Sequence, residues 1–245
     1  MLGLGSSLIT PGGVSEVIPS EISGLQIWYK NATGVTAAQW DDSSGNGRHA
    51  VQGDTDLQGA VSDGGIDFND AIPQDFYNIT ESSGYVNLGG TNAFTLACVM
   101  KRENAAADDI TLLGGDAHNN VIMFLDEEVV RYRNAGTGGA NVESTFATDT
   151  WEVNDKMLFT MVKDTSGNLE FYKNGTQVTP TGQTNHPNTG EGFDARFLGT
   201  RTDGTHDTND EQFDGIIYEF ALYNTELTGD DLSNLNSYLT RKFSL

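Results

Sequence analysis

Short segments in which apolar and polar residues alternate recur along most of the chain, and they constrain the fold more than any other feature of the sequence. Alternation with a period of two places the apolar side chains on one face of a β-strand. The intervening stretches are rich in Gly, Asn, Asp, Ser and Thr, which favour turns. The pattern therefore predicts many short antiparallel strands. Clear examples are LQIWYK at residues 25–30, FTLACVM at 94–100, MLFTMVKD at 157–164 and IIYEFALY at 216–223.

Two hairpins can be placed within this pattern. In FYKNGTQV, the dipeptide Asn174-Gly175 is the strongest short hairpin signal, because a type I′ turn needs two residues that tolerate positive φ. In VIMFLDEEVVRYR, the acidic pair Asp126-Glu127 predicts a second turn. Both segments indicate that strands close in sequence pair with each other.

One segment has the pattern of a helix, and it lies at the end of the chain. Within LTGDDLSNLNSYLTRKF, Thr228 and Asp231 have the spacing of a capping box. Many strands followed by one late helix are typical of an antiparallel sandwich. The apolar residues that recur at helical spacing on one face are Leu232, Leu235, Leu239 and Phe243.

Composition excludes several partners. The chain has 245 residues and 37% hydrophobic content, enough for one large all-β domain. Its 35 acidic and 13 basic residues give a net charge of −22, which repels nucleic acid and anionic membranes, so we expect neither as a partner. The one cysteine, Cys98, cannot form an internal disulfide and is expected to be a buried apolar side chain. No segment resembles a signal peptide or reaches transmembrane length, so we expect synthesis and folding in a cytosol.

The sequence offers no catalytic motif: it has no P-loop, HExxH, GxSxG or CxxC pattern. A glycosidase needs two carboxylates across a cleft, but the best acidic run, Asp126–Glu128, falls on a predicted turn. We therefore do not expect an enzyme. Four histidines stand in polar loops without a second ligand at metal-binding spacing: His49, His118, His186 and His206.

Two loops could hold calcium. Hard oxygen ligands on a glycine-bearing loop suit Ca²⁺, and RTDGTHDTNDEQFDG supplies Asp203, Asp207 and Asp210. The loop WDDSSGNGRHA at residues 40–50 supplies Asp42 and Asn46. Acidic loops also arise from composition alone in a chain of net charge −22, so a solvated loop or a plain turn is the favoured interpretation. A structural calcium ion is the alternative, and no other cofactor is expected.

The loop WDDSSGNGRHA resembles the W-x-D-x-SGNG-x-x-A element of laminin-G-like, concanavalin-A-like jelly rolls. Later segments resemble other elements of that family in the same order: FTLACVMKR, LFTMVKDTSGNLEFYKNGTQV and FDGIIYEFALYNTELTGDDLSNLNSYLTRKF. The resemblance covers residues 22–243. It implies an all-β, two-sheet antiparallel jelly-roll sandwich with a short C-terminal helix over residues 22–245. Family roles range from glycan binding to scaffolding.

Two departures from the family pattern limit what the resemblance implies. Members with a structural calcium often carry Asp before the Glu of the closing strand, whereas here Tyr218 precedes Glu219. Glucanase relatives carry a catalytic E-x-D-x-x-E strand, which this sequence lacks. The family's calcium site and its enzymatic activity are therefore not carried over.

Residues 1–21 differ from the rest and predict an N-terminal arm for assembly contacts. The opening MLGLGSSLIT resembles the openings of virion structural proteins from marine tailed phages. We therefore expect a non-enzymatic virion protein, a capsid decoration, fibre or tail component, that contacts other virion proteins or a second copy of itself. Apolar residues without regular periodicity supply the arm contacts: Leu2, Leu4, Leu8, Ile9, Val14, Val17 and Ile18.

The alternative function is a carbohydrate-binding adhesin domain that recognises a cell-surface glycan. Sugars stack on aromatic rings, and the candidates are Trp28, Trp40 and Trp151. Each of the three stands in or beside a predicted strand, which favours packing in the core instead.

Overall fold

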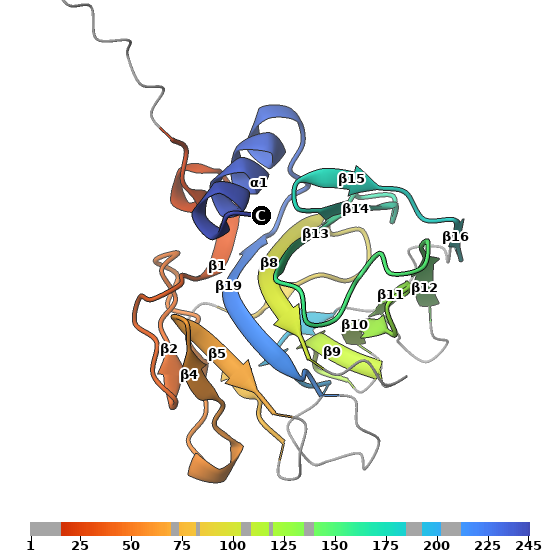
Figure 1. Cartoon of the computed structure of the whole chain (residues 1–245). Helices are drawn as coiled ribbons and strands as arrows, with labels where there is room; N and C mark the ends of the chain where they lie inside the picture. Colours follow the sequence, from red (N-terminus) through yellow and green to blue (C-terminus); the bar gives the residue numbers. More distant parts are fainter. Residues whose placement is uncertain are drawn as a thin grey trace, which may run out of the picture.

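Two antiparallel sheets packed face to face form the body of the protein (Figure 1). The computed structural model describes residues 16–69, 74–81, 84–103, 109–117, 120–134, 140–184, 193–201 and 212–245. Within these residues the eight-stranded sheet runs β15 (Thr176–Val178), β14 (Leu169–Lys173), β13 (Met157–Lys163), β8 (Phe94–Arg102), β19 (Gly215–Tyr223), β5 (Gly65–Phe68) and β4 (Ala60–Ser62). Its eighth strand, β1 (Leu25–Tyr29), also pairs with β19.

The second sheet has nine strands among the described residues. In order they are β16 (Gly182–Gln183), β12 (Ala140–Thr145), β11 (Val129–Asn134), β10 (Asn120–Leu125), β9 (Asp109–Gly114), β18 (Phe197–Leu198), β6 (Tyr77–Ile79), β3 (Ala50–Val51) and β2 (Gln39–Trp40). A separate pair joins β17 (Asp194–Ala195) to β7 (Val86–Asn87). The helices are η1 (Pro19–Glu21), η2 (Thr55–Leu57) and α1 (Gly229–Phe243).

Strand β8 is buried on both faces, and alternation divides its side chains between two cores. Phe94, Leu96, Cys98 and Met100 belong to the core between the sheets, and Ala97 and Val99 belong to a second core on the outer face of the eight-stranded sheet. Cys98 is fully buried as predicted, and burial raises the pKa of its thiol.

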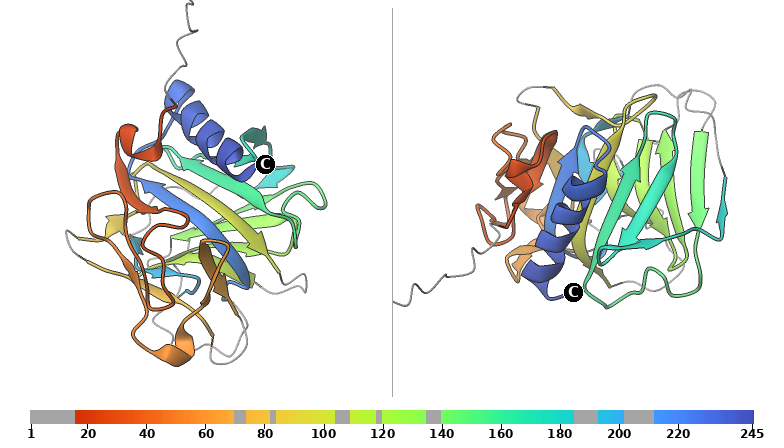
Figure 2. Two further views of the ribbon diagram at one scale, coloured as in Figure 1. Left: turned by 60° about the vertical axis from the view of Figure 1, so that its left-hand side comes forward. Right: turned by 90° about the horizontal axis from the view of Figure 1, so that it is seen from above.

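Helix α1 lies across the outer face of the eight-stranded sheet (Figure 2) and forms the second core with it. Leu232, Leu235 and Leu239 are buried there as predicted, and Phe243 packs at the edge. Thr228 is the N-cap residue, but its side chain makes no capping hydrogen bond, so the predicted capping box is wrong. The burial of the leucine face therefore holds this helix in place without that cap.

Both predicted hairpins are confirmed. Asn174 and Gly175 connect β14 to β15 with φ of 50° and 78°, as a type I′ turn requires. The turn between β10 and β11 contains Asp126 at φ 64°. None of the helices in the described part of the chain is long and apolar enough to cross a membrane.

The segment before β1 packs on the domain. Val17 and Ile18 contact the second core, and the Tyr223 hydroxyl donates to the carbonyl of Pro19 at 3.1 Å. Glu16 pairs with Arg241 on α1 at 2.7 Å. Val17 and Ile18 therefore contribute to the domain itself. The other predicted arm residues lie outside the described residues: Leu2, Leu4, Leu8, Ile9 and Val14.

Candidate functional site

The three tryptophans are core residues, as their positions in or beside predicted strands indicated. Trp40, on β2, is fully buried, stacks on Tyr29 at 5.7 Å and donates its indole N–H to the carbonyl of Lys30 at 3.1 Å. Trp28 and Trp151 are also buried. None of these rings is available as a stacking platform for a sugar.

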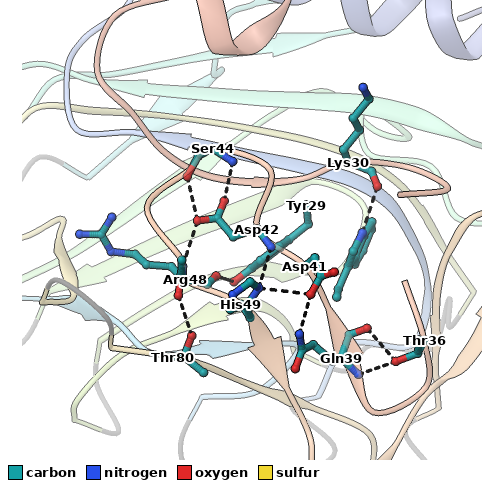
Figure 3. A network of polar contacts seen from close by, with 12 residues as sticks. Tyr29, Lys30, Thr36, Gln39, Asp41, Asp42, Ser44, Arg48, His49 and Thr80 are labelled. Carbon is teal, nitrogen blue, oxygen red and sulfur yellow. Dashed lines mark hydrogen bonds and ion pairs between the residues drawn. The ribbon is translucent and has the colours of Figure 1, made fainter. Parts of the chain in front are cut away.

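Asp42 organises the turn that follows β2 (Figure 3). Its carboxylate accepts the main-chain N–H groups of Trp28, Ser44 and Arg48, each at 2.9 Å, and its Oδ2 lies 2.8 Å from the Ser44 hydroxyl. The Asn46 amide donates at 3.1 Å to the carbonyls of residues 25 and 26. Both calcium candidates of this loop therefore serve the turn itself.

The candidate ligands of the other predicted calcium loop lie outside the described part of the chain. Among the described residues, no group of three or more His, Cys, Asp and Glu side chains could hold a metal ion. Asp203, Asp207 and Asp210 lie outside the described residues, as do His118, His186 and His206. Calcium at that acidic loop stays a prediction.

Asp41 points away from the turn, unlike its neighbour Asp42. Its carboxylate Oδ1 accepts from the Gln39 amide at 2.5 Å and lies 3.3 Å from Nδ1 of His49 (Figure 3). That Nδ1 also accepts the main-chain N–H of Asp42 at 3.1 Å, so we assign the proton of a neutral His49 to Nε2. The Asp41 side chain is 48% exposed.

A hollow of about 470 Å³ opens beside Asp41 at the edge of the nine-stranded sheet. Its polar side chains come from Thr36, Gln39 and Asp41, and aliphatic residues line the rest together with Gly34. Gly34 adopts φ 61°, and a Cβ there would lie 2.4 Å from Oδ2 of Asp41, so glycine is required for this close approach. The aliphatic lining residues are Ala32, Val35 and Ala38.

Two oxygen acceptors on residues that line this hollow have no partner among the described residues. They are Oδ2 of Asp41 and Oε1 of Gln39. A carboxylate and a carboxamide beside aliphatic side chains can bind hydroxyl groups while the aliphatic side chains contact carbon–hydrogen surface. Sequence reasoning missed this site. A signal was present, because Gln39 and Asp41 flank the buried Trp40, and alternation turns both outward.

Residues 77–233, more than half of the chain, match the family Laminin_G_3, described as the concanavalin A-like lectin/glucanases superfamily. The chain belongs to Laminin_G_3. The resemblance seen in the sequence is thereby confirmed, as are the two-sheet sandwich and the C-terminal helix of this Laminin_G_3 protein. No protein of curated function matches its sequence.

Solved structures share the fold of this Laminin_G_3 chain at low sequence identity. The binding domain of botulinum neurotoxin DC in complex with SialylT has a TM-score of 0.62 at 12% identity, covering 89% of this chain and 52% of that chain. A structure of botulinum neurotoxin type C has a TM-score of 0.60 at 14% identity, covering 90% of this chain and 52% of that chain. Cell entry of that toxin is described as dependent on interaction with two ganglioside molecules. A Trypanosoma rangeli sialidase has a TM-score of 0.58 at 14% identity, covering 89% and 33%.

This chain therefore spans about half the length of the toxin chains and a third of the sialidase chain. At these identities the likeness concerns the fold. The ligands named for those proteins are not assigned to this chain, and the residues of the hollow are judged on their own chemistry.

Proposed function

We propose that the protein is a non-enzymatic, lectin-like module that binds a glycan in the hollow beside β2. The observation that carries this proposal is the pair of open acceptors on Asp41 and Gln39 in a hollow that is also lined by aliphatic residues. Neighbouring sugar hydroxyls donate to such acceptors, while the ring carbons rest on Ala32, Val35 and Ala38. The volume of about 470 Å³ lies within the range of small-ligand sites, roughly 300–1,000 Å³.

The charge of the hollow favours an uncharged sugar. Asp41 is the charged residue among those that line it, and the whole chain carries −22. A sugar carboxylate placed beside Asp41 meets like-charge repulsion, which costs affinity. The glycans named for the structural neighbours support glycan binding as a class, while this charge points to neutral hexoses or acetamido sugars.

Hydrolysis is not proposed for this hollow. Glycosidases generally place two carboxyl groups within roughly 5–9.5 Å of each other across the bond they cleave. Among the described residues, Asp41 is the one carboxylate that lines the hollow, and the carboxylate of Asp42 is engaged in holding the adjacent turn. One carboxylate can bind a sugar hydroxyl, but no other described residue that lines the hollow supplies the second carboxyl group that a glycosidase needs.

Glycan binding is tested on an array that presents neutral and sialylated glycans to the full chain. We expect signal on neutral glycans and its loss in Asp41→Ala and Gln39→Ala. Asp155→Ala is the matched control, because Asp155 is an exposed acid on the loop before β13. Absence of any signal, or equal signal in Asp41→Ala and the control, contradicts the proposal.

We also propose a second role, as a structural or accessory protein of a virion: a capsid decoration, fibre or tail component. The supporting observation is that residues 16–22 are fixed against α1 and β19, through Glu16–Arg241 and Tyr223–Pro19. The apolar residues that precede them therefore start from a defined place on the surface, from which they can contact a neighbouring subunit.

Deleting residues 1–15 tests that role. We expect an unchanged melting temperature and loss of incorporation into particles. Deleting residues 1–22 is the comparison, and it lowers the melting temperature because it also removes the buried Pro19 and Ile22. Normal incorporation of the shorter deletion contradicts an assembly role for the arm.

A further inference from the structure

A second hollow lies at the opposite edge of the nine-stranded sheet. It has a volume of about 280 Å³ and is bordered by β14, the end of β15 and β16. In the strand order of that sheet β16 is first and β2 is last, and the two strands lie on opposite sides of the molecule (Figure 1). The polar residues that line it are Glu170, Gln177, Thr179 and Gln183, and the apolar ones are Leu169, Val178 and Pro180.

The second hollow exists because the chain changes sheets there. Strand β15 ends at Val178, and Thr181 then pairs with the other sheet by donating its N–H to the carbonyl of Thr145 at 2.7 Å. Pro180 lies in between and has no N–H, so it cannot extend the pairing with β14. Space is left open beside Leu169 and Glu170.

The two hollows share one chemistry although they share no strand. Each combines a carboxylate, a threonine, three apolar residues and at least one carboxamide. These polar residues are Asp41, Gln39 and Thr36 in the first hollow, and Glu170, Gln177, Gln183 and Thr179 in the second. In each, one carboxylate oxygen is engaged by a neighbour. The Tyr172 hydroxyl donates to Oε2 of Glu170 at 2.7 Å, as Gln39 does to Asp41.

Residues that line the second hollow carry open acceptors as well. Oε1 of Glu170 and the whole carboxamide of Gln177 have no partner among the described residues. The Tyr172 phenol keeps its proton as donor over the ordinary pH range, because burial and the Glu170 contact raise its pKa to about 12. The phenol therefore remains a donor to one oxygen of Glu170, as the Gln39 amide is to Asp41 in the first hollow.

We propose that the second hollow is a further glycan site and that one chain is bivalent. It takes a single neutral sugar ring, because its volume lies just below the roughly 300 Å³ at which small-ligand sites begin. Sites on opposite edges cannot engage one short oligosaccharide together. They bridge two glycan chains, so binding to a glycan-bearing surface gains from avidity. This inference rests on the proposed function of the first hollow.

Side-chain amide resonances give separate readouts of the two sites. Methyl glycosides of glucose, galactose, mannose and N-acetylglucosamine are titrated into ¹⁵N-labelled full-length protein. We expect shifts of both the Gln39 and Gln177 amides, with the weaker affinity at Gln177. Asp41→Ala removes the response at Gln39 only, and Glu170→Ala removes the response at Gln177 only. Glu226→Ala, an exposed acid before α1, is the control.

A second measurement uses polyacrylamide that carries the same sugar. We expect the wild type to cross-link the polymer and each single variant to bind it with an affinity about 10²-fold lower. A response at Gln39 alone, or loss of both responses in Asp41→Ala, overturns bivalency and leaves glycan binding in the first hollow intact. A response at Gln177 alone overturns both bivalency and the first hollow as the glycan site. No response at either glutamine, with no signal on the array, overturns the proposed function together with this inference.

Discussion

Strand β1 joins two regions that are held together by different interactions. On one side Trp28 packs into the second core beneath α1. On the other side the main-chain N–H of the same residue donates to Asp42 and fixes the turn after β2. The first region depends on apolar area removed from water, and the second depends on hydrogen bonds to one carboxylate.

The layer under α1 contains one buried acid, and its placement shows how that layer tolerates a charge. A β-bulge in β19 shifts the register between Ile217 and Glu219, so that Tyr218 and Glu219 both face outward. Glu219 accepts from the Trp28 indole at 2.9 Å and pairs with Lys242 of α1. Acids that are buried or enclosed, such as Glu219 and Asp42, serve the fold. Acids that keep an open oxygen, such as Asp41, are the ones to examine for function.

The largest effect on stability is expected in the second core, beneath α1. Leu235 is fully buried between α1 and the sheet, so Leu235→Ala should lower the free energy of unfolding by about 2–5 kcal/mol. Ser237→Ala, on the exposed face of α1, should stay within about 0.5 kcal/mol of the wild type. Urea unfolding measures both. A small loss for Leu235→Ala would mean that the helix layer contributes little to stability.

Asp42→Ala should have the next largest effect. The substitution leaves the N–H groups of Trp28, Ser44 and Arg48 without their acceptor, and we expect a loss of about 2–4 kcal/mol in the same urea measurement. Like the loss in Leu235→Ala, it should come with little change in the slope of free energy against urea. An effect near zero would show that water replaces the carboxylate in the turn.

Residue pattern alone was enough to predict the regular part of this fold. Alternation identified β8, β13 and β19, helical spacing identified the face of α1, and Asn174-Gly175 located a hairpin. These elements follow local rules that a short stretch of sequence carries in full. The capping box at Thr228 does not form, and burial of the leucine face, which no capping motif records, holds the helix instead.

The two hollows could not be predicted from the sequence, because each depends on where the chain runs after an element ends. The first requires Gly34 to approach Asp41 across a loop, and the second requires the chain to leave β15 at Pro180 for the other sheet. Alternation around Trp40 shows that Gln39 and Asp41 face outward. It does not show that Thr36 and the alanines of the loop close a hollow around them.

A smaller effect on stability is expected at Lys163. Asp42 accepts hydrogen bonds from main-chain N–H groups, whereas Lys163 donates hydrogen bonds to main-chain carbonyls. Its buried ammonium group donates to the carbonyls of Gly90, Asn92 and Asp164 at 2.8–3.3 Å. Burial lowers its pKa to about 8 from the ordinary lysine value of 10.5. Between those values the unfolded chain binds more protons than the folded one, so stability should rise with pH. At about 1.4 kcal/mol per pKa unit, the change is on the order of 1–3 kcal/mol.

Lys163→Met isolates that effect, because it removes the titrating group and keeps the length of the side chain. Buried tyrosines, whose pKa values are raised, lower stability as pH rises above about 10 in both proteins, so the difference between wild type and variant is the quantity to follow. In denaturant unfolding, we expect the free energy of unfolding of the wild type to rise relative to that of the variant between pH 7.5 and 9.5. A constant difference would mean that the three carbonyls keep the ammonium charged.

The smallest effect on stability is expected at Asp41, one residue from Asp42. Its Oδ1 contacts are with the side chains of Gln39 and His49, which water can replace at this exposed position, so Asp41→Ala should change the free energy of unfolding by less than about 0.5 kcal/mol. The same variant should lose glycan binding, whereas Asp155→Ala should lose neither. If Asp41→Ala instead costs as much as Asp42→Ala, the carboxylate of Asp41 is part of the turn. The open oxygen would then be a by-product of folding, and the first hollow would lose the observation on which its function rests.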